Sequence, residues 1–148
     1  MAELDNDQLE IIHHEGFDPS QRIVYVPAIR KVSGTLVFIS GITAAPPYHD
    51  HPHRPEQFEA IPSDIDSQVE LLYDHIDLAL NAAGCRRQDI VVMNRFFTHV
   101  REDQDVVNAH QGKWLGGHIP TSTSVEVKSL ATDPKLRLEI SVVAVARG

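Results

Sequence analysis

The hydrophobic pattern of the chain changes its period several times, and this limits the possible folds more than any other feature. Between Ser63 and Gly84, apolar residues recur at steps of three and four, at Ile65, Val69, Leu72, Ile76, Leu80 and Ala83. Such spacing is typical of a helix that packs one face on a core. Pro62, Ser63 and Asp66 predict the start of this helix through a capping-box-like pair, and Gly84 predicts its end.

Segments typical of strands precede this helix. Residues 9–14 form a short mixed run, and residues 22–29 are rich in β-branched and aromatic side chains, although Pro27 places this second segment at an edge or a bulge. The run 36–40 is continuously apolar, which predicts a strand buried on both faces. Five prolines between residues 42 and 62 exclude regular structure and predict a long surface loop.

After the helix the pattern returns to strands. Residues 89–99 predict a strand and residues 103–115 a second helix, while residues 121–128 and 136–146 alternate with period two. Strands, helix, strand, helix and strands in this order predict an α+β fold, with a mixed six-stranded sheet and two helices on one face.

Length and composition predict one domain over residues 1–148, with residues 1–8 frayed. Hydrophobic residues make up 42% of the chain, enough for a core, and the single cysteine, Cys85, excludes an internal disulfide. The formal net charge of −8 argues against a nucleic-acid backbone or an anionic membrane as a partner. No apolar run approaches the roughly 18 residues of a membrane span, and the start lacks the order of a signal peptide. We therefore expect a cytoplasmic protein.

The penultimate predicted strand is lined with hydroxyl groups. Because the side chains of a strand alternate between its faces, Ser122, Ser124 and Glu126 point the same way. A short turn that contains a proline joins this strand to the last one, so we expect the two strands to be adjacent. Ser141 and Glu139 would then lie opposite the two serines and form a polar cleft floor with them.

Three segments resemble the RidA/YjgF family of small trimeric proteins. The family signature is similar to Pro120-Thr-Ser-Thr-Ser-Val-Glu-Val127 with the turn and strand that follow it. The paired opening strands of the family are similar to Tyr25-Val-Pro-Ala-Ile29 and Gly34-Thr-Leu-Val-Phe-Ile-Ser-Gly41. The resemblance extends from about Leu9 onward. It implies a RidA/chorismate-mutase-like fold and a homotrimer with helices outside, whose small-molecule sites lie in clefts between subunits.

The resemblance also implies site residues. Where the imine deaminases of the family have an arginine that pairs with a substrate carboxylate, this chain has Ser122. Ser124 stands where a cysteine is frequent, and Ser141 stands where a glutamate is thought to help activate water, while Glu139 keeps a carboxylate two residues earlier. We therefore expect 2-imino acids to be poor substrates. The matching positions that survive are Tyr25, Ser40, Gly41 and Asn108.

Other residues could replace the missing groups. Arg95, on a neighbouring predicted strand, could supply the cation, or it could form an ion pair with a carboxylate. Ser122 and Ser124 could hydrogen-bond a substrate oxygen, or they could be small residues at a subunit contact. Glu139 or Glu126 could assist proton transfer. A nucleophilic serine would need a base, for which the candidates are His99, His110 and His118.

The proline-rich loop contains the sequence His49-Asp-His-Pro-His53. Imidazole and carboxylate groups could hold a divalent metal ion. A solvated loop without support for its ligands instead favours a lid or a rim beside the cleft. We therefore expect no metal ligands here and no cofactor.

Two classes of function fit these residues. The first is a small-molecule hydrolase or deaminase that acts on an imine, an enamine or a related unsaturated nitrogen compound at a cleft between subunits. The second is a non-catalytic ligand-binding or regulatory trimer of the same fold. Both predict a small-molecule partner and a homotrimer, with neither a nucleic acid nor a membrane as a partner.

Overall fold

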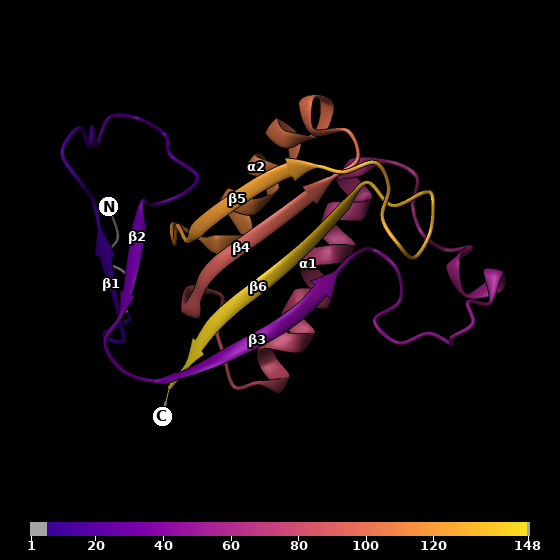
Figure 1. Ribbon diagram of the computed structural model, residues 1–148, viewed down its shortest axis with the longest axis horizontal. Coiled ribbons are helices and arrows are strands. Elements are labelled where there is room, and N and C mark those ends of the chain that lie inside the picture. Colours follow the sequence, from indigo (N-terminus) through magenta and orange to yellow (C-terminus); the bar gives the residue numbers. More distant parts are fainter. Residues whose placement is uncertain (1–5, 148) are drawn as a thin grey trace.

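The computed structural model describes residues 6–147 of the protein (Figure 1). Its elements alternate as the sequence predicts. In chain order they are β1 (Leu9–Ile12), β2 (Ala28–Lys31), β3 (Thr35–Ile42), the 3-10 turn η1 (Pro55–Phe58), α1 (Ile65–Ala82), the 3-10 turn η2 (Arg87–Asp89), β4 (Ile90–Phe97), α2 (Val100–Leu115), β5 (Thr121–Glu126) and β6 (Leu138–Ala146).

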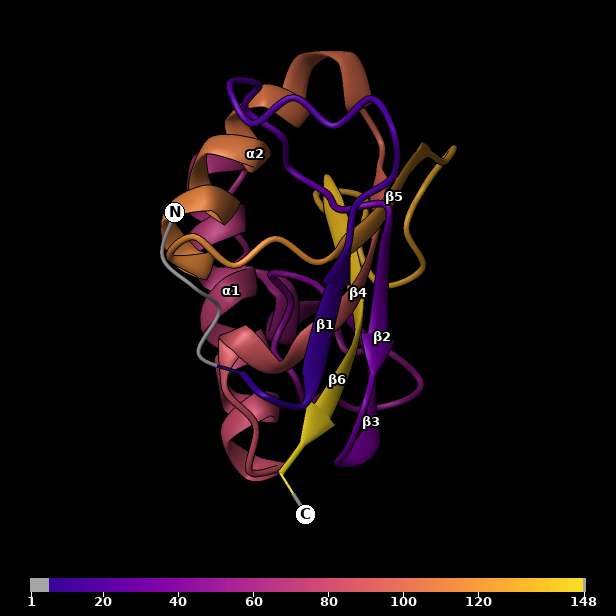
Figure 2. The ribbon, with the colours of Figure 1, turned by 90° about the vertical axis from the view of Figure 1, so that its left-hand side faces the viewer.

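Four strands form the main sheet, in the order β3-β6-β4-β5. β4 and β5 are parallel, whereas β6 is antiparallel to both of its neighbours, so the sheet is mixed. Both helices lie behind this sheet in Figure 1, and the view from the side in Figure 2 shows them as a layer against one face. The predicted α+β fold with two helices on one face of a mixed sheet is therefore confirmed. On the other face, Leu9 of β1 and Ile29 of β2 cluster with Val145 at one end of the sheet, and no helix covers the rest within the described residues.

The six strands do not form a single sheet, however. β1 and β2 pair only with each other in a separate two-stranded sheet. The backbone N–H of Val32 continues this small ladder by donating to the carbonyl of Gln8 at 2.8 Å. Gly34 then turns the chain with a φ of +87°, a conformation that glycine adopts without strain, before β3 begins. This turn separates β2 from the main sheet, and no pattern of side chains announces it.

The core lies between the helices and the sheet. α1 buries Leu72, Ile76 and Leu80 against residues of β4 and β6 such as Phe97 and Ile140, all of them at most 1% exposed. Complete burial of such a side chain contributes roughly 1.5–3 kcal/mol. These positions are the stripe that the spacing of three and four predicts, so the hydrophobic period alone determines which side of α1 faces the sheet.

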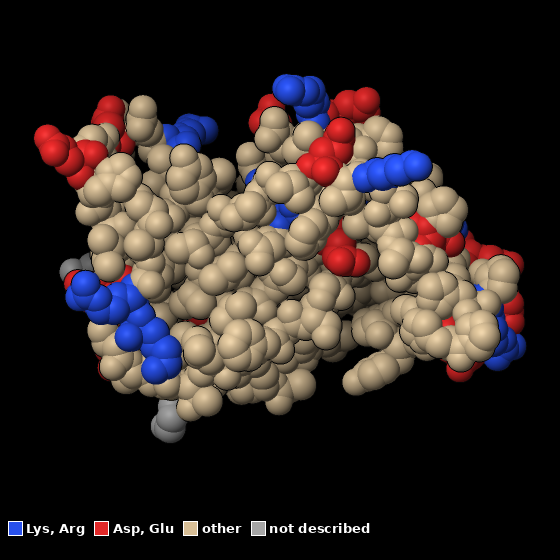
Figure 3. Space-filling model, viewed as in Figure 1, with Lys and Arg blue, Asp and Glu red and all other residues tan. Residues whose placement is uncertain are grey.

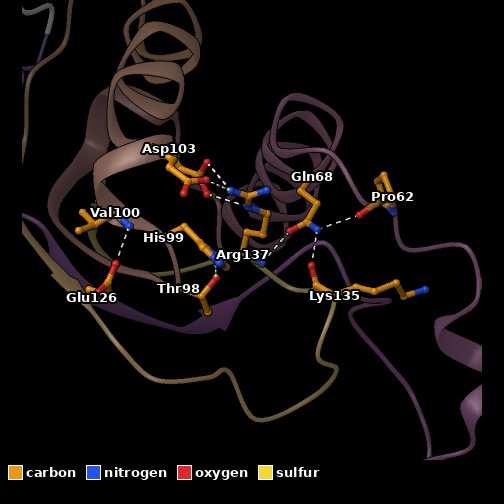
Figure 4. A network of polar contacts seen from close by, with 10 residues as sticks. Pro62, Gln68, Thr98, His99, Val100, Asp103, Glu126, Lys135 and Arg137 are labelled. Carbon is orange, nitrogen blue, oxygen red and sulfur yellow. Dashed lines mark hydrogen bonds and ion pairs between the residues drawn. The ribbon is translucent and has the colours of Figure 1, made fainter.

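Both helices begin at other residues than the sequence predicts. Asp64, rather than Ser63, caps α1, because its side chain accepts a hydrogen bond from the backbone N–H of Ser67 at 2.9 Å. α2 begins at Val100, three residues before the predicted Asp103. Glu126 Oε1 accepts from the N–H of Val100 at 3.0 Å (Figure 4), so a carboxylate from β5 caps the first turn of this helix.

Asp103 has a different task within α2. It is only 2% exposed, and its two carboxylate oxygens each accept a hydrogen bond from Arg137, one from Nε and one from a terminal guanidinium nitrogen, both at 2.9 Å. Figure 4 shows this fork between α2 and the segment that leads into β6. The ion pair therefore joins the first turn of α2 to the sheet.

β3 is not buried on both faces, as its apolar sequence predicts. It is an edge strand of the sheet in this chain, and Phe38 pairs with Val143 of β6 on the face that no helix covers. Phe38 is 76% exposed and Leu36 is 47% exposed. The centre of this open face carries few charged side chains, as Figure 3 shows. An apolar strand at an edge thus presents its side chains outward.

The long loop and the start of the chain are held in place by burial. The loop between β3 and α1 buries Phe58 and Ile61 in a small cluster with Leu136. Asn6 and Gln8, which we expected to fray, are 3% and 5% exposed, while residues 1–5 lie outside the described residues. Within residues 6–147, no helix has the length and apolar character that a membrane crossing requires.

Candidate functional site

Arg95 is a buried cation surrounded by neutral oxygens. Its side chain extends from β4 toward α2 and the residue is 4% exposed. Nε donates to the hydroxyl of Ser124 at 2.9 Å, and one terminal nitrogen donates to Asn108 Oδ1 at 2.7 Å and to Gln111 Oε1 at 3.3 Å. The guanidinium also lies 5.3 Å from the ring centroid of Phe97. Three predicted site residues, Arg95, Asn108 and Ser124, therefore meet at one place.

No negative charge balances this guanidinium among the described residues, where Arg95 forms no ion pair. Burial lowers the pKa of Arg95 from its ordinary value, yet a guanidinium stays protonated at neutral pH. The nearest phenol is Tyr73, whose hydroxyl donates to Gln111 at 3.2 Å. Burial raises the pKa of Tyr73, so this phenol is neutral as well. Such a site can accept an anionic group.

Sequence reasoning missed Gln111 and Tyr73. Gln111 lies three residues after Asn108 on α2, a spacing that places both side chains on one face of a helix. That spacing could have indicated a pair of amide oxygens facing the sheet. Tyr73 lies inside the apolar stripe of α1, so it had been indistinguishable from a core residue.

The two serines of β5 do not share a cleft floor with Ser141 and Glu139. β4 lies between β5 and β6, so the strands that we expected to be adjacent are not neighbours. This expectation was wrong because β5 does not form a hairpin with β6. It pairs in parallel with β4 instead. Ser122 is opposite Met93 on β4 and Ser124 is opposite Arg95, so both serines face α2.

Glu139 points to the opposite face of the sheet from Arg95. It is the partner of Phe96 across the antiparallel ladder, whereas Arg95 is the partner of Ile140, a core residue beneath the helices. Burial raises the pKa of the Glu139 carboxyl from its ordinary value. Its carboxylate lies so close to Gly41 that a Cβ atom at that position would be 2.7 Å from Oε2.

Glu139 also lines a cleft of about 1050 Å³ beside β3. The cleft is bounded by both faces of β3, by the second half of α1 and by the loop that follows β3. His75 of α1 holds that loop through a contact of 2.9 Å between Nδ1 and the carbonyl of Thr43. The predicted residues that line this cleft are Ser40, Gly41, His49 and Glu139.

The remaining predicted residues are dispersed. Tyr25 is 56% exposed and lies outside any strand, next to Val26, whose N–H donates to the carbonyl of Pro120 at 3.1 Å. Ser141 is half-buried on the face of Glu139, opposite Asn94. Glu126 caps α2 as described above.

The three histidines considered as bases have other partners. His110 Nε2 contacts Asp66 Oδ1 at 2.8 Å, His118 Nε2 contacts the carbonyl of Ile90 at 2.6 Å, and His99 Nδ1 contacts the hydroxyl of Thr98 at 2.9 Å. Between residues 6 and 147, none of them hydrogen-bonds to Ser122 or Ser124. A serine nucleophile activated by histidine is therefore absent from this part of the chain.

Comparison with solved structures supports one fold. The chain resembles the Rid-family protein YyfB of Yersinia pestis with a TM-score of 0.75 and 21% identity, covering 93% of this chain and 98% of that one. A Thermotoga maritima protein gives a TM-score of 0.62 at 27% identity, with 84% of this chain and 87% of that one covered.

A third structure comes from a named family. Rv2704 of Mycobacterium tuberculosis, a member of the YjgF/YER057c/UK114 family, gives a TM-score of 0.60 at 23% identity, with 93% of this chain and 99% of that one covered. No curated protein matches the chain. Residues 18–146 match the family described as Endoribonuclease L-PSP. With this match over most of its length and with Rid and YjgF proteins as structural neighbours, the chain belongs to the Endoribonuclease L-PSP family, that is, to the RidA/YjgF proteins.

Proposed function

We propose that the protein is a small-molecule hydrolase of the deaminase type, which acts on an imine, an enamine or a related unsaturated nitrogen compound at a cleft between subunits. The observation that carries this proposal is the buried guanidinium of Arg95, whose protein partners are all neutral oxygens. A substrate carboxylate would supply the missing negative charge, and guanidinium groups bind carboxylates in a bidentate geometry.

The edge of β5 gives this cation an approach. Ser124 is exposed on a strand that pairs only with β4, and its hydroxyl already bonds Arg95 Nε. A carboxylate at this edge would replace or share that bond. Ser122, on the same face of β5, would contribute a second hydroxyl. Arg95 thus takes the part of the arginine that the family has at the position of Ser122.

Glu139 is the proposed acid and base. In the reaction, water adds to the carbon of a C=N bond, and the resulting carbinolamine releases ammonia and leaves a carbonyl compound. A carboxyl whose pKa is raised by burial transfers protons more readily near neutral pH. Because Glu139 and Arg95 of one chain face opposite sides of the sheet, one small substrate cannot contact both. A neighbouring subunit would have to complete the site, which is why the proposal includes a homotrimer.

The second candidate function is a ligand-binding trimer without catalysis. The separation of Arg95 from Glu139 favours it, as does serine at both positions where the deaminases have charged residues. An activity on RNA, which the family description names, has less support, because a net charge of −8 repels a phosphate backbone.

A test combines turnover with ligand binding. Imines generated in situ by an amino-acid oxidase are offered to the protein, and semicarbazide reports the imine that survives. We expect 2-imino acids, 2-aminoacrylate among them, to be hydrolysed more slowly than by a relative that has the arginine at the position of Ser122. Rates equal to those of that relative would show that Arg95 replaces the arginine fully.

Two variants separate the candidate functions. Arg95→Lys keeps the charge but loses the fork, and should weaken binding at least tenfold. Glu139→Gln should lower turnover by roughly 10²-fold while leaving binding intact. Binding without turnover in the wild type would favour the second function. Binding that is unchanged in Arg95→Lys would remove Arg95 from the site and contradict the proposal.

A further inference from the structure

Three histidines of the loop between β3 and α1 surround a common point. His49, His51 and His53 each offer one ring nitrogen, and these three atoms all lie within 4.8 Å of one another. The ring centroids are 4.8 Å apart for His49 and His51, 5.2 Å for His49 and His53, and 4.7 Å for His51 and His53. Three nearly equal separations place the rings around a centre rather than in a row.

The ring of His49 is oriented by a hydrogen bond. Its Nδ1 lies 3.0 Å from the carbonyl oxygen of Pro46, which can only accept, so Nδ1 carries the proton and Nε2 presents its lone pair. Histidines that bind metal ions almost always donate their other ring N–H in this way, frequently to a backbone carbonyl. The sequence did not show a group that orients a metal-binding histidine, and for His49 the carbonyl of Pro46 has this role.

Phe58 fixes the position of two of the rings. It is 3% exposed and contacts the rings of His49 and His53 edge to face, with centroid separations of 5.1 and 5.3 Å. Phe58 belongs to the buried cluster that attaches the loop to the rest of the fold, so its contacts restrain the positions of the two histidine rings.

Polar contacts brace the loop behind the rings. The backbone N–H of Asp50 donates to Gln57 Oε1 at 2.9 Å, and Gln57 Nε2 donates to the Asp50 carboxylate at 3.1 Å. Arg54 pairs with the same carboxylate at 3.4 Å and with Glu56 at 2.8 Å. Asp50 is thus engaged within the loop and is not a member of the histidine group, which leaves three imidazole nitrogens as the ligands.

We propose that His49, His51 and His53 bind a divalent first-row transition-metal ion, with Zn²⁺ as the expected ion and water in the fourth position. Zinc binds imidazole nitrogen at about 2.0–2.1 Å in tetrahedral geometry, which requires nitrogens about 3.3 Å apart. Rotation of the exposed His51 side chain, with a smaller adjustment of His53 against Phe58, would close the remaining gap. Mg²⁺ and Ca²⁺ prefer oxygen ligands and do not suit this set.

The ion would lie at the rim of the cleft beside β3, because His49 lines that cleft. Three protein ligands with one open position are the arrangement of catalytic rather than structural zinc sites. The proposal concerns metal binding by the loop and does not depend on the proposed function.

The test is a titration of the full chain without an affinity tag, after removal of metal by a chelator. Calorimetry with ZnCl₂ should give one ion per chain with a Kd of about 1 μM or tighter. His51→Ala and His53→Ala should each weaken binding at least tenfold, since both side chains are exposed and dispensable for folding. His14→Ala removes an exposed histidine outside the loop and should bind like the wild type. Millimolar Mg²⁺ should not compete.

Co²⁺ provides a second measurement. The intense visible absorption of four-coordinate Co²⁺ should appear in the wild type and disappear in the two loop variants. The proposal is overturned if the wild type binds no stoichiometric Zn²⁺, or if the double variant of His51 and His53 binds as tightly as the wild type. The weak spectrum of six-coordinate Co²⁺ would overturn the tetrahedral arrangement with three histidines.

Discussion

The ion pairs of this protein differ in how much they contribute to its stability. The fork between Asp103 and Arg137 is buried on the carboxylate side, whereas the pair of Glu10 and Arg30 is more than half exposed on both sides. Breaking a buried pair leaves an uncompensated charge and costs about 3 kcal/mol or more, but an exposed pair contributes less than about 1 kcal/mol.

We expect Asp103→Asn to lower the free energy of unfolding by about 2 kcal/mol, because the buried charged acceptor is lost while Arg137 keeps its ion pair with Glu102 at 3.2 Å. Urea unfolding, followed by circular dichroism, measures this loss. Glu10→Gln is the matched control, and its effect should stay below about 1 kcal/mol. Equal losses in the two variants would contradict the assignment of Asp103 as the anchor of α2.

Glu139 gives a prediction for pH. Burial raises its pKa in the folded protein above the ordinary value of 4.5, so the folded state binds more protons than the unfolded state. Stability from this group is complete below pH 4.5 and is lost as the pH rises through the folded pKa. Glu139→Gln should therefore be more stable than the wild type above this window and similar to it below. Urea midpoints measured across the range would contradict this if the two curves ran parallel.

At the scale of elements, features that depend on residues near in sequence could be predicted. Features that depend on contacts between distant residues could not. The stripe of α1 is written in the spacing of Leu72, Ile76 and Leu80, so its buried face follows from the sequence. The start of α2 depends on Glu126, which is 26 residues from Val100 in sequence, and no local pattern contains that contact. The order of β5, β4 and β6 likewise rests on long-range pairing.

The candidate site divides in the same way. Ser124, Asn108 and Arg95 were each identifiable as polar residues on predicted elements, and the resemblance to a family named the first two. Their meeting depends on the parallel register of β4 and β5, which sets Arg95 opposite Ser124. Their separation from Glu139 depends on the antiparallel register of β4 and β6, which sets Arg95 opposite Ile140 and places Glu139 on the other face.

Mutation can test which residue caps the start of α1, because the sequence predicts Ser63 and the structure places Asp64 there. Asp64→Ala should lower the urea midpoint of unfolding, because the N–H of Ser67 loses its acceptor. Ser63→Ala, one residue earlier, should leave this midpoint nearly unchanged. Thermal or urea unfolding of both variants compares the two residues directly. A larger loss for Ser63→Ala would restore Ser63 as the cap.

At the scale of the whole molecule, the face of the sheet opposite the helices leads to a prediction about assembly. Apolar side chains such as Phe38 and Leu36 are exposed there, and proteins seldom leave such a surface to solvent. We expect light scattering at micromolar concentration to give three times the chain mass of 16.5 kDa.

Variants with a new charge test which surface is involved. Phe38→Glu should convert the trimer to monomer, because it would place a carboxylate in the apolar contact. Leu78→Glu changes a residue on α1 that is 62% exposed and should leave the trimer intact. A monomeric wild type would remove the shared site as well, whereas dissociation only in Leu78→Glu would assign the contact to the helices.

The close approach of Gly41 to Glu139 offers a means of moving a reactive group without deleting it. A methyl group at position 41 would meet the carboxylate at 2.7 Å, and the far end of a glutamate side chain can yield where backbone could not. Gly41→Ala should keep the fold and the charge while displacing the carboxylate by a fraction of its own length. Enzymes lose rate steeply with such displacements, so this variant separates the need for an acid from the need for its position. In evolutionary terms, glycine at position 41 has no reactive group of its own, yet its lack of a side chain determines where the Glu139 carboxylate can lie.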